Sequence, residues 1–408
     1  MTVSRPATAT QSFNAPETNS ARRLVSLDVF RGLIVAAMIL VTDPGTYSAV
    51  YPQLLHAPWN GITATDTIFP SFLFIVGVSI TLSFASRLRR GDSRSTLAWH
   101  VLRRSVVIFV LGLAVNGFPD YHWQTLRLPG ILQRIAVCYL FGALLYLLVF
   151  PDTRQNEHSK ARIQTAVLAT ITVGILTLYY LLLKIVPAPG FEAGRLDSLG
   201  SLPAYIDRAA FGTKHLWPYG ITPGVGVTYD PEGILSTLPA IATVLIGVLV
   251  GGWLRAERPA RQKLAFLLAA GVVLLLAGWL LQPLLPINKR LWTSTFVLFS
   301  SGISLLVFAL VYAVVDLQQS RWWTAPALVF GTNAILAFVL SSVITSSIDH
   351  IHVPGGGAAV SLHKWAYQHI FASWLMPIHA SIAYAIMIVL VNLALIFPLY
   401  RKRMYVRI

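Results

Sequence analysis

Long apolar runs recur along the whole chain, and they constrain its fold more than any other feature. A helix needs about 20 mostly apolar residues to cross a bilayer. The chain is 55% hydrophobic and only 12% charged, whereas soluble domains are about 25% charged. We therefore predict an all-α fold, a polytopic membrane helical bundle with about 10 transmembrane helices. The expected spans are 25–42, 68–86, 105–118, 131–150, 164–186, 233–252, 264–282, 292–315, 325–345 and 381–400.

The basic residues predict how this bundle is oriented. The net charge is +15, but Lys and Arg gather at helix ends and not in one basic domain, so we do not expect a nucleic-acid partner. With the N-terminus in the cytosol, the loops carry 21 Lys and Arg on the cytosolic side and 7 on the other. By the positive-inside rule this predicts a multi-pass protein with both termini cytosolic. Residues 1–21 are polar and predict a disordered cytosolic tail, and 22–408 predict one transmembrane domain.

The connection between the first two spans carries the strongest candidate site. It reads HAPWNGITATDTIFP from His56 to Pro70, and polar groups near membrane depth are costly and often functional. Asp66 could hold one tautomer of His56 while the other ring nitrogen acts as a base or nucleophile. The alternative is an interfacial histidine in a wet loop. Trp59 and Asn60 are predicted substrate contacts, but they are equally typical of an interface anchor and a turn former.

Two arginines lie within apolar segments and need partners there. Arg134, in PGILQRIAVCY, is predicted either to form an interhelical salt bridge or to contact a phosphate or carboxylate of the substrate. Arg31 lies three residues after Asp28, on the same helical face. This pair predicts either a structural ion pair or part of an anion site near the cytosolic mouth.

Further polar residues lie at the predicted extracytosolic helix ends. Taken alone, each of them is typical of a cap or turn: Asn116, Asp230, Glu232, Asn288 and Lys289. Together with His56 they give one membrane face many polar side chains, which suits a sugar-like substrate. Asn333 is expected to make a packing hydrogen bond inside the span 325–345.

Metal chemistry has little support in the sequence. His350 and His352 follow Asp349 and could share a metal, but a third clear ligand is missing. The chain has no HExxH, P-loop or GxSxG motif. We predict no metal site.

Several blocks of the chain carry a family resemblance. They are RLVSLDVFRG, HAPWNGITATDTIFPSFLFIVG, LPGILQRIAVCY, YDPEGILSTLPAIATVLIGVLVG, PINKRLWTSTFVL, FGTNAIL and the final YRKRMYVRI. In order and spacing the chain resembles bacterial members of the heparan-α-glucosaminide N-acetyltransferase family, which are transmembrane acyltransferases. The resemblance implies a transmembrane acyltransferase-like bundle, often a homodimer, in the bacterial inner membrane.

The resemblance also implies a reaction and a catalytic residue. Family members transfer an acetyl group from cytosolic acetyl-CoA, a substrate and not a resident cofactor, to an amine across the membrane. The histidine of the H-A-x-W-N-G block is catalytic in the family, and it corresponds to His56. The expected acceptor is an amino sugar or glycan. One departure stands out: the family pattern V-N-x-x-G reads VTDPG here, so Thr42 replaces the Asn and Asp43 is predicted to contact the substrate in its stead.

The donor should enter from the cytosolic side. Arg31, Arg87, Arg103 and Arg104 are candidates to bind its nucleotide phosphates, because arginine suits phosphate by bidentate hydrogen bonding. They are also the basic residues expected of topology determinants. His56 could attack the thioester or act as a general base on the amine, and both routes stay open.

Two other classes of function fit the composition. A membrane transporter of a small polar solute would also place charges within the membrane and a polar face outside. A structural or assembly membrane protein would not need so many polar residues on one side.

Overall fold

The described part of the chain, residues 24–149, 157–355 and 358–404 of a computed structural model, is mostly helical. The tail expected for residues 1–21 lies outside these residues. The elements are α1 Val25–Thr42, η1 Pro52–Leu54, α2 Ala64–Arg89, α3 Arg94–Gly117, α4 Ile131–Val149, α5 Glu157–Ile185, α6 Leu202–Phe211, η2 Thr213–His215, β1 Ile221–Thr222, β2 Gly226–Val227, α7 Ile234–Arg255, α8 Ala260–Leu280, α9 Ser294–Tyr312, η3 Ala313–Leu317, α10 Ala325–Thr332, α11 Ala334–His350, β3 His352–Gly355, β4 Ala358–Ser361, α12 Leu362–Ala366, η4 Tyr367–Phe371 and α13 Pro377–Arg401. The strands form two antiparallel hairpins, with Ile221 opposite Val227 and His352 opposite Ser361.

The long helices confirm the predicted membrane bundle. Among the described residues, nine helices are long and apolar enough to cross a membrane. A tenth span results if α10 and α11 are counted together, although they meet at an angle of 89°. The single helix predicted for 325–345 was therefore wrong in shape. The break falls at Asn333, where φ is −128° and ψ is 43°, and where Nδ2 of the side chain donates to the backbone oxygen of Met404 at 3.5 Å.

The third span is longer than the sequence suggested. It was predicted to begin at residue 105, yet α3 begins at Arg94, where Ser93 accepts a hydrogen bond from the backbone N–H of Thr96. Arg103 and Arg104 consequently lie within a helix and not in a loop. Long arginine side chains allow this, because their apolar stems pack while the charged heads reach a polar or aromatic partner. The Arg104 guanidinium lies 5.0 Å from the centroid of the Tyr139 ring.

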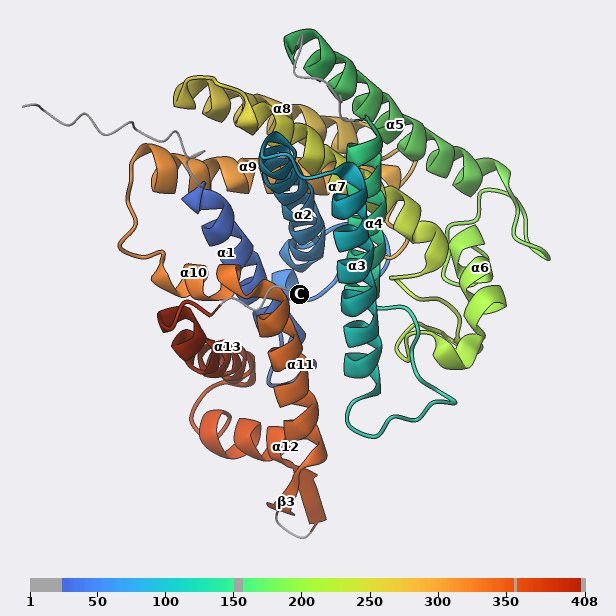
Figure 1. Cartoon of the computed structure of the whole chain (residues 1–408). Helices are drawn as coiled ribbons and strands as arrows, with labels where there is room; N and C mark the ends of the chain where they lie inside the picture. Colours follow the sequence, from blue (N-terminus) through green and yellow to red (C-terminus); the bar gives the residue numbers. More distant parts are fainter. Residues whose placement is uncertain (1–23, 150–156, 356–357, 405–408) are drawn as a thin grey trace, which may run out of the picture.

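Helices α2 and α7 form the centre of the bundle (Figure 1). In both, 72% of the most apolar window is buried, against 17% in α8. Their close approach depends on glycine: a Cβ on Gly77 would lie 2.0 Å from the backbone oxygen of Val244, and one on Gly247 would lie 2.1 Å from that of Phe74. Small residues allow helices in a membrane to pack this closely. The helices with little burial, α3, α5, α8 and α13, present apolar side chains outward, as expected of lipid-facing surfaces.

The connections at one end of the bundle pack against one another. Backbone hydrogen bonds join Gly61 to Ile287 (2.8 Å) and Leu128 to His215 (3.0 Å). A third joins Gly45 to Ser381 (3.2 Å), and the β3–β4 hairpin projects beyond α11 and α12 at this end (Figure 1). We call the whole assembly the loop cluster. It consists of residues 43–63, 118–130, 186–233, 281–293 and 351–376 as far as they are described.

Candidate active site

His56 and Asp66 form a close pair at the entrance to α2. The Nδ1 atom of His56 lies 2.7 Å from Oδ1 of Asp66. Asp66 is only 1% exposed, and its Oδ2 accepts hydrogen bonds from the backbone N–H groups of Ala57 (3.1 Å) and Thr63 (3.0 Å). This carboxylate therefore acts as an acceptor, so Nδ1 of His56 donates to it. The other ring nitrogen, Nε2, then carries the lone pair that a base or nucleophile requires.

The second neighbour of His56 is Lys289, from the loop between α8 and α9. Its Nζ lies 3.2 Å from Nε2 and 3.4 Å from Nδ1 of His56. Burial lowers the pKa of His56 most strongly, the charge of Lys289 lowers it further, and the hydrogen bond to Asp66 opposes both. Burial also lowers the pKa of Lys289 itself. His56 is thus held neutral at neutral pH, while its side chain remains 42% exposed.

A pair of asparagines joins the two loops that carry these residues. Nδ2 of Asn288 donates to Oδ1 of Asn60 at 3.0 Å, and Oδ1 of Asn288 accepts from the backbone N–H of Leu291 at 2.8 Å. Gly61 follows with φ of 102°, a conformation that favours glycine. The asparagines therefore set the position of Lys289 relative to His56.

Trp59 attaches the same loop to the long segment before α7. Its indole N–H donates to the backbone oxygen of Leu196 at 2.8 Å. Its ring packs edge-on against Tyr229, with centroids 5.1 Å apart, and Arg290 donates to the hydroxyl of Tyr229. Trp59 and Tyr229 together form an aromatic surface at the loop that carries His56.

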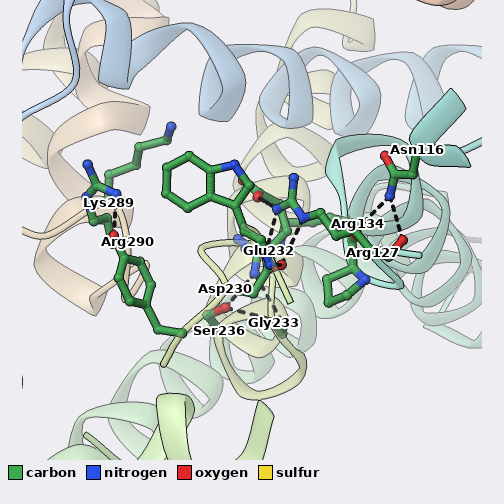
Figure 2. A network of polar contacts seen from close by, with 12 residues as sticks. Asn116, Arg127, Arg134, Asp230, Glu232, Gly233, Ser236, Lys289 and Arg290 are labelled. Carbon is green, nitrogen blue, oxygen red and sulfur yellow. Dashed lines mark hydrogen bonds and ion pairs between the residues drawn. The ribbon is translucent and has the colours of Figure 1, made fainter. Parts of the chain in front are cut away.

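Figure 2 shows a network of charges around Arg127, Asp230 and Glu232, and the two carboxylates closely follow Tyr229 in the sequence. Arg127 binds both oxygens of Asp230, at 2.8 and 2.7 Å, and also Oε2 of Glu232 at 2.6 Å. The charges of Arg127, Arg134 and Lys289 lower the pKa of Glu232 against the opposing effect of burial. Sequence reasoning treated Asp230 and Glu232 as cap or turn residues and missed Arg127 as their partner. The only signal was opposite charge on one predicted membrane face.

Arg134 is buried within the bundle beside this network. It donates to the backbone oxygen of Gly233 at 3.1 Å and to the hydroxyl of Ser236. Its guanidinium lies 5.0 Å from the centroid of the Trp292 ring. Within the described residues its Nε and Nη1 atoms have no hydrogen-bond partner, although Glu232 lies near enough to feel its charge.

Two predicted substrate contacts lie elsewhere. Asn116 donates to the backbone oxygens of Arg127 and Pro129, both at 2.9 Å, so it shapes the α3–α4 loop at the edge of the network (Figure 2). Asp43 accepts from the hydroxyl of Ser341 at 2.8 Å. Burial raises the pKa of Asp43 to about 6. The structure groups Asp43 with α11 and not with His56.

The predicted donor-binding arginines lie on α1, α2 and α3. Arg31 contacts Oδ1 of Asp28 at 3.0 Å and the hydroxyl of Ser79 at 2.7 Å, and Arg87 contacts Asp92 at 2.6 Å. Arg103 is exposed on α3, next to Arg104. At 1.5 Å per residue, Arg87 lies about 31 Å along α2 from Asp66, a distance close to the thickness of a hydrocarbon core.

A second histidine–aspartate pair, which was not predicted, joins the end of α11 to α12. Nδ1 of His363 lies 2.8 Å from Oδ1 of Asp349, and Nε2 lies 3.1 Å from the backbone oxygen of Gly45. The ring stacks on Tyr384, with centroids 4.7 Å apart. Asp349 therefore pairs with His363, and the part of the chain that the structure describes holds no group of three His, Cys, Asp or Glu that could bind a metal ion.

Comparison with known proteins assigns the chain to a family. The family model for the catalytic part of heparan-alpha-glucosaminide N-acetyltransferase matches residues 23–281. The chain belongs to this family. The matched residues include His56, Asp66, Arg134 and Glu232 but end before Lys289.

Two curated relatives extend the similarity along most of the chain. Heparan-alpha-glucosaminide N-acetyltransferase of Mus musculus is 32% identical over 365 residues, which cover 81% of this chain and 55% of the mouse protein. The protein of the same name from Homo sapiens is 31% identical over 353 residues, covering 78% and 52% respectively. The chain thus spans about half the length of the curated relatives it matches.

Proposed function

We propose that this protein is an integral membrane acetyltransferase that moves an acetyl group from cytosolic acetyl-CoA to the amino group of an extracytosolic amino sugar or glycan. The observation that carries the proposal is the His56 ring. Its Nδ1 is bound to a buried carboxylate at 2.7 Å, and the side chain as a whole is 42% exposed in the loop cluster. Because the chain belongs to an acetyltransferase family, acetyl transfer is the reaction that we propose for this ring.

His56 can serve the transfer in two ways. In the first, Nε2 attacks the thioester carbon, the C–S bond breaks, coenzyme A leaves as a thiolate, and the acceptor amine then takes the acetyl group from the ring. In the second, Nε2 removes a proton from the amine while the amine attacks the thioester carbon, the C–S bond breaks, and the imidazolium returns the proton to the departing coenzyme A thiolate. Asp66 holds the same tautomer in both and stabilises the imidazolium when it forms.

The donor and acceptor would approach from opposite ends of the bundle. Arg31, Arg87, Arg103 and Arg104 are the proposed contacts for the donor phosphates, and the thioester end reaches toward His56 through the bundle. The orientation, with cytosolic termini in a bacterial inner membrane, follows from the basic residues in the loops and is part of the proposal.

The acceptor would bind in the loop cluster. Trp59 and Tyr229 offer aromatic surface to a sugar ring, and Asn60 and Asn288 offer amide groups beside His56. Arg134 has two guanidinium nitrogens without hydrogen-bond partners among the described residues, which suit a carbonyl or anionic group of a substrate. Asn116 and Asp43 would act indirectly, by shaping the loops.

The test uses purified full-length protein in detergent with radiolabelled acetyl-CoA, with and without glucosamine. Acetylglucosamine should form with the wild type and not with His56→Ala. Label retained on the wild-type protein and discharged by glucosamine would select the covalent route. Product without retained label would select the general-base route. In a parallel sample reconstituted in lipid vesicles, solute flux without acetyl-CoA consumption would contradict the proposal and favour a transporter.

A further inference from the structure

Lys289 places a cation close to the nitrogen of His56 that is proposed to react. Nδ1 of His56 donates to Asp66, so the lone pair is on Nε2, and the Lys289 ammonium lies 3.2 Å from that nitrogen. An ammonium group can donate but cannot accept. Its Nζ lies almost as close to Nδ1, at 3.4 Å. The ammonium therefore lies over the ring beside Nε2 and leaves the in-plane lone pair of Nε2 for the proposed reaction.

The loop that carries Lys289 has a fixed conformation. Asn288, the preceding residue, is 0% exposed and is hydrogen-bonded to Asn60 and to the N–H of Leu291. Trp292 has φ of 52° and is 0% exposed. The backbone of this loop therefore holds Lys289 beside His56, and motion is left to the side chain.

The charges around Lys289 include carboxylates toward which its side chain can turn. Asp66 on α2 and Glu232 before α7 attract it, whereas Arg134 on α4 and Arg290 in its own loop repel it. Glu232 already accepts a hydrogen bond from Arg127 at 2.6 Å. The ammonium can leave Nε2 without losing a nearby negative charge.

We propose that Lys289 is a further catalytic residue, whose ammonium lies beside Nε2 of His56 in the free protein and donates to the acyl oxygen of the donor during transfer. This inference rests on the proposed function. It concerns a residue outside the part of the chain that the family model matches.

The electron balance is the same for both routes described above. When a nucleophile bonds to the thioester carbon, the carbonyl electron pair moves to the acyl oxygen, which becomes an oxyanion. Lys289 donates a hydrogen bond to that oxygen and keeps its proton. The carbonyl then re-forms as the C–S bond breaks and coenzyme A leaves as a thiolate. A fixed donor toward an oxyanion is commonly worth about 10²–10³-fold in kcat.

Lys289→Met is the primary variant. We expect kcat to fall by about 100-fold or more. We also expect the acid limb of the kcat/KM profile to move to higher pH by about one unit, because a neighbouring like charge no longer disfavours the imidazolium of His56. Lys289→Arg should keep the acid limb in place, since it keeps the charge, while losing much of kcat because a guanidinium presents its donors differently. Arg195→Met is the matched control and should change neither kcat nor the acid limb. It removes a cation at the same end of the bundle, and the Arg195 side chain is 47% exposed and paired with Asp197.

A second readout is independent of acetyl transfer. Diethyl pyrocarbonate acylates neutral imidazole, and mass spectrometry of the His56 peptide gives the rate at each pH. The midpoint should lie about one pH unit higher in Lys289→Met than in the wild type. An unchanged midpoint, or wild-type kcat in Lys289→Met, would overturn the role of Lys289 alone. Absence of transfer in the wild type itself would instead overturn the proposed function, and the catalytic role of Lys289 with it. If Lys289→Met fails to fold, Lys289→Gln keeps the polar volume, loses the charge and carries the same expectations.

Discussion

The two histidine–aspartate pairs have the same kind of contact between ring nitrogen and carboxylate but different surroundings. His56 lies 2.7 Å from Asp66, and His363 lies 2.8 Å from Asp349. The other nitrogen of His56 faces an ammonium group at 3.2 Å, whereas that of His363 faces the backbone oxygen of Gly45 at 3.1 Å. The group nearest the second ring nitrogen is therefore a cation at His56 and a carbonyl oxygen at His363.

This difference sets the protonation of each ring. An oxygen acceptor on each nitrogen requires two N–H groups, so His363 is favoured as an imidazolium, and the hydrogen bond to Asp349 is the largest cause of its raised pKa. His56 has a lowered pKa because of burial first and Lys289 in addition. The same pair of residue types thus favours a neutral imidazole at His56 and an imidazolium at His363.

The largest expected effect separates the two histidines by activity. His56→Gln should lose at least about 10³-fold in acetyl transfer, because no other described group holds a free imidazole lone pair at this position. His363→Gln should keep transfer close to wild type. Initial rates with labelled acetyl-CoA and glucosamine at neutral pH measure both. Equal losses in the two variants would remove the distinction between the pairs.

Substitution of the two carboxylates should affect acetyl transfer in the same order as substitution of the two histidines, with a smaller loss. Asp66→Asn should lower kcat by about 100-fold or more, because an amide no longer fixes the tautomer or stabilises the imidazolium. Asp349→Asn is the matched control and should leave kcat nearly unchanged. The comparison would fail if Asp349→Asn were the slower enzyme.

Loop positioning should contribute less than the pair itself. Asn288→Ala removes hydrogen bonds to Asn60 and to the N–H of Leu291. At about 1 kcal/mol each, they should cost about tenfold or more in kcat/KM. Asn392→Ala, which truncates an asparagine of α13 that is also 0% exposed, controls for the loss of a buried amide. A fall in kcat/KM only in the second variant would contradict the role of Asn288.

The smallest effect concerns stability and not rate. Because the pKa of His363 is raised in the folded protein, its contribution is fully present below its unfolded pKa and is lost as pH rises through the folded value. His363→Gln should therefore lower the free energy of unfolding by about 1 kcal/mol at pH 5.5, and by less at pH 8.5. Thermal unfolding in detergent at the two pH values measures this. A larger loss at the higher pH would mean that His363 is neutral in the folded state.

Much of the fold could be predicted because a bilayer leaves few alternatives. Backbone polar groups in hydrocarbon must be satisfied within each segment, so the apolar runs predicted the spans and their number of about ten. The break at Asn333 and the start of α3 at Arg94 were missed. The start of α3 has a cap at Ser93, and Asn333 contacts Met404 from the far end of the chain; hydropathy registers neither contact.

Part of the candidate site could also be read along the chain. His56 and Asp66 are ten residues apart on either side of one turn, and their contact was predicted from that spacing. Lys289 was expected on the same membrane face, but its contact with His56 spans 233 residues of sequence. Nothing in either segment alone specifies that contact.

The sequence by itself determined a membrane-spanning helical protein, its family and the histidine most suited to chemistry, because these follow from hydropathy, spacing and motif order. Only the tertiary structure decided which charges face that histidine. It placed Lys289 beside His56 and Gly45 beside His363, and it assembled Arg127, Asp230 and Glu232 from two loops. Electrostatic effects depend on distance in space and on burial, and both arise only when separate segments of the chain pack together.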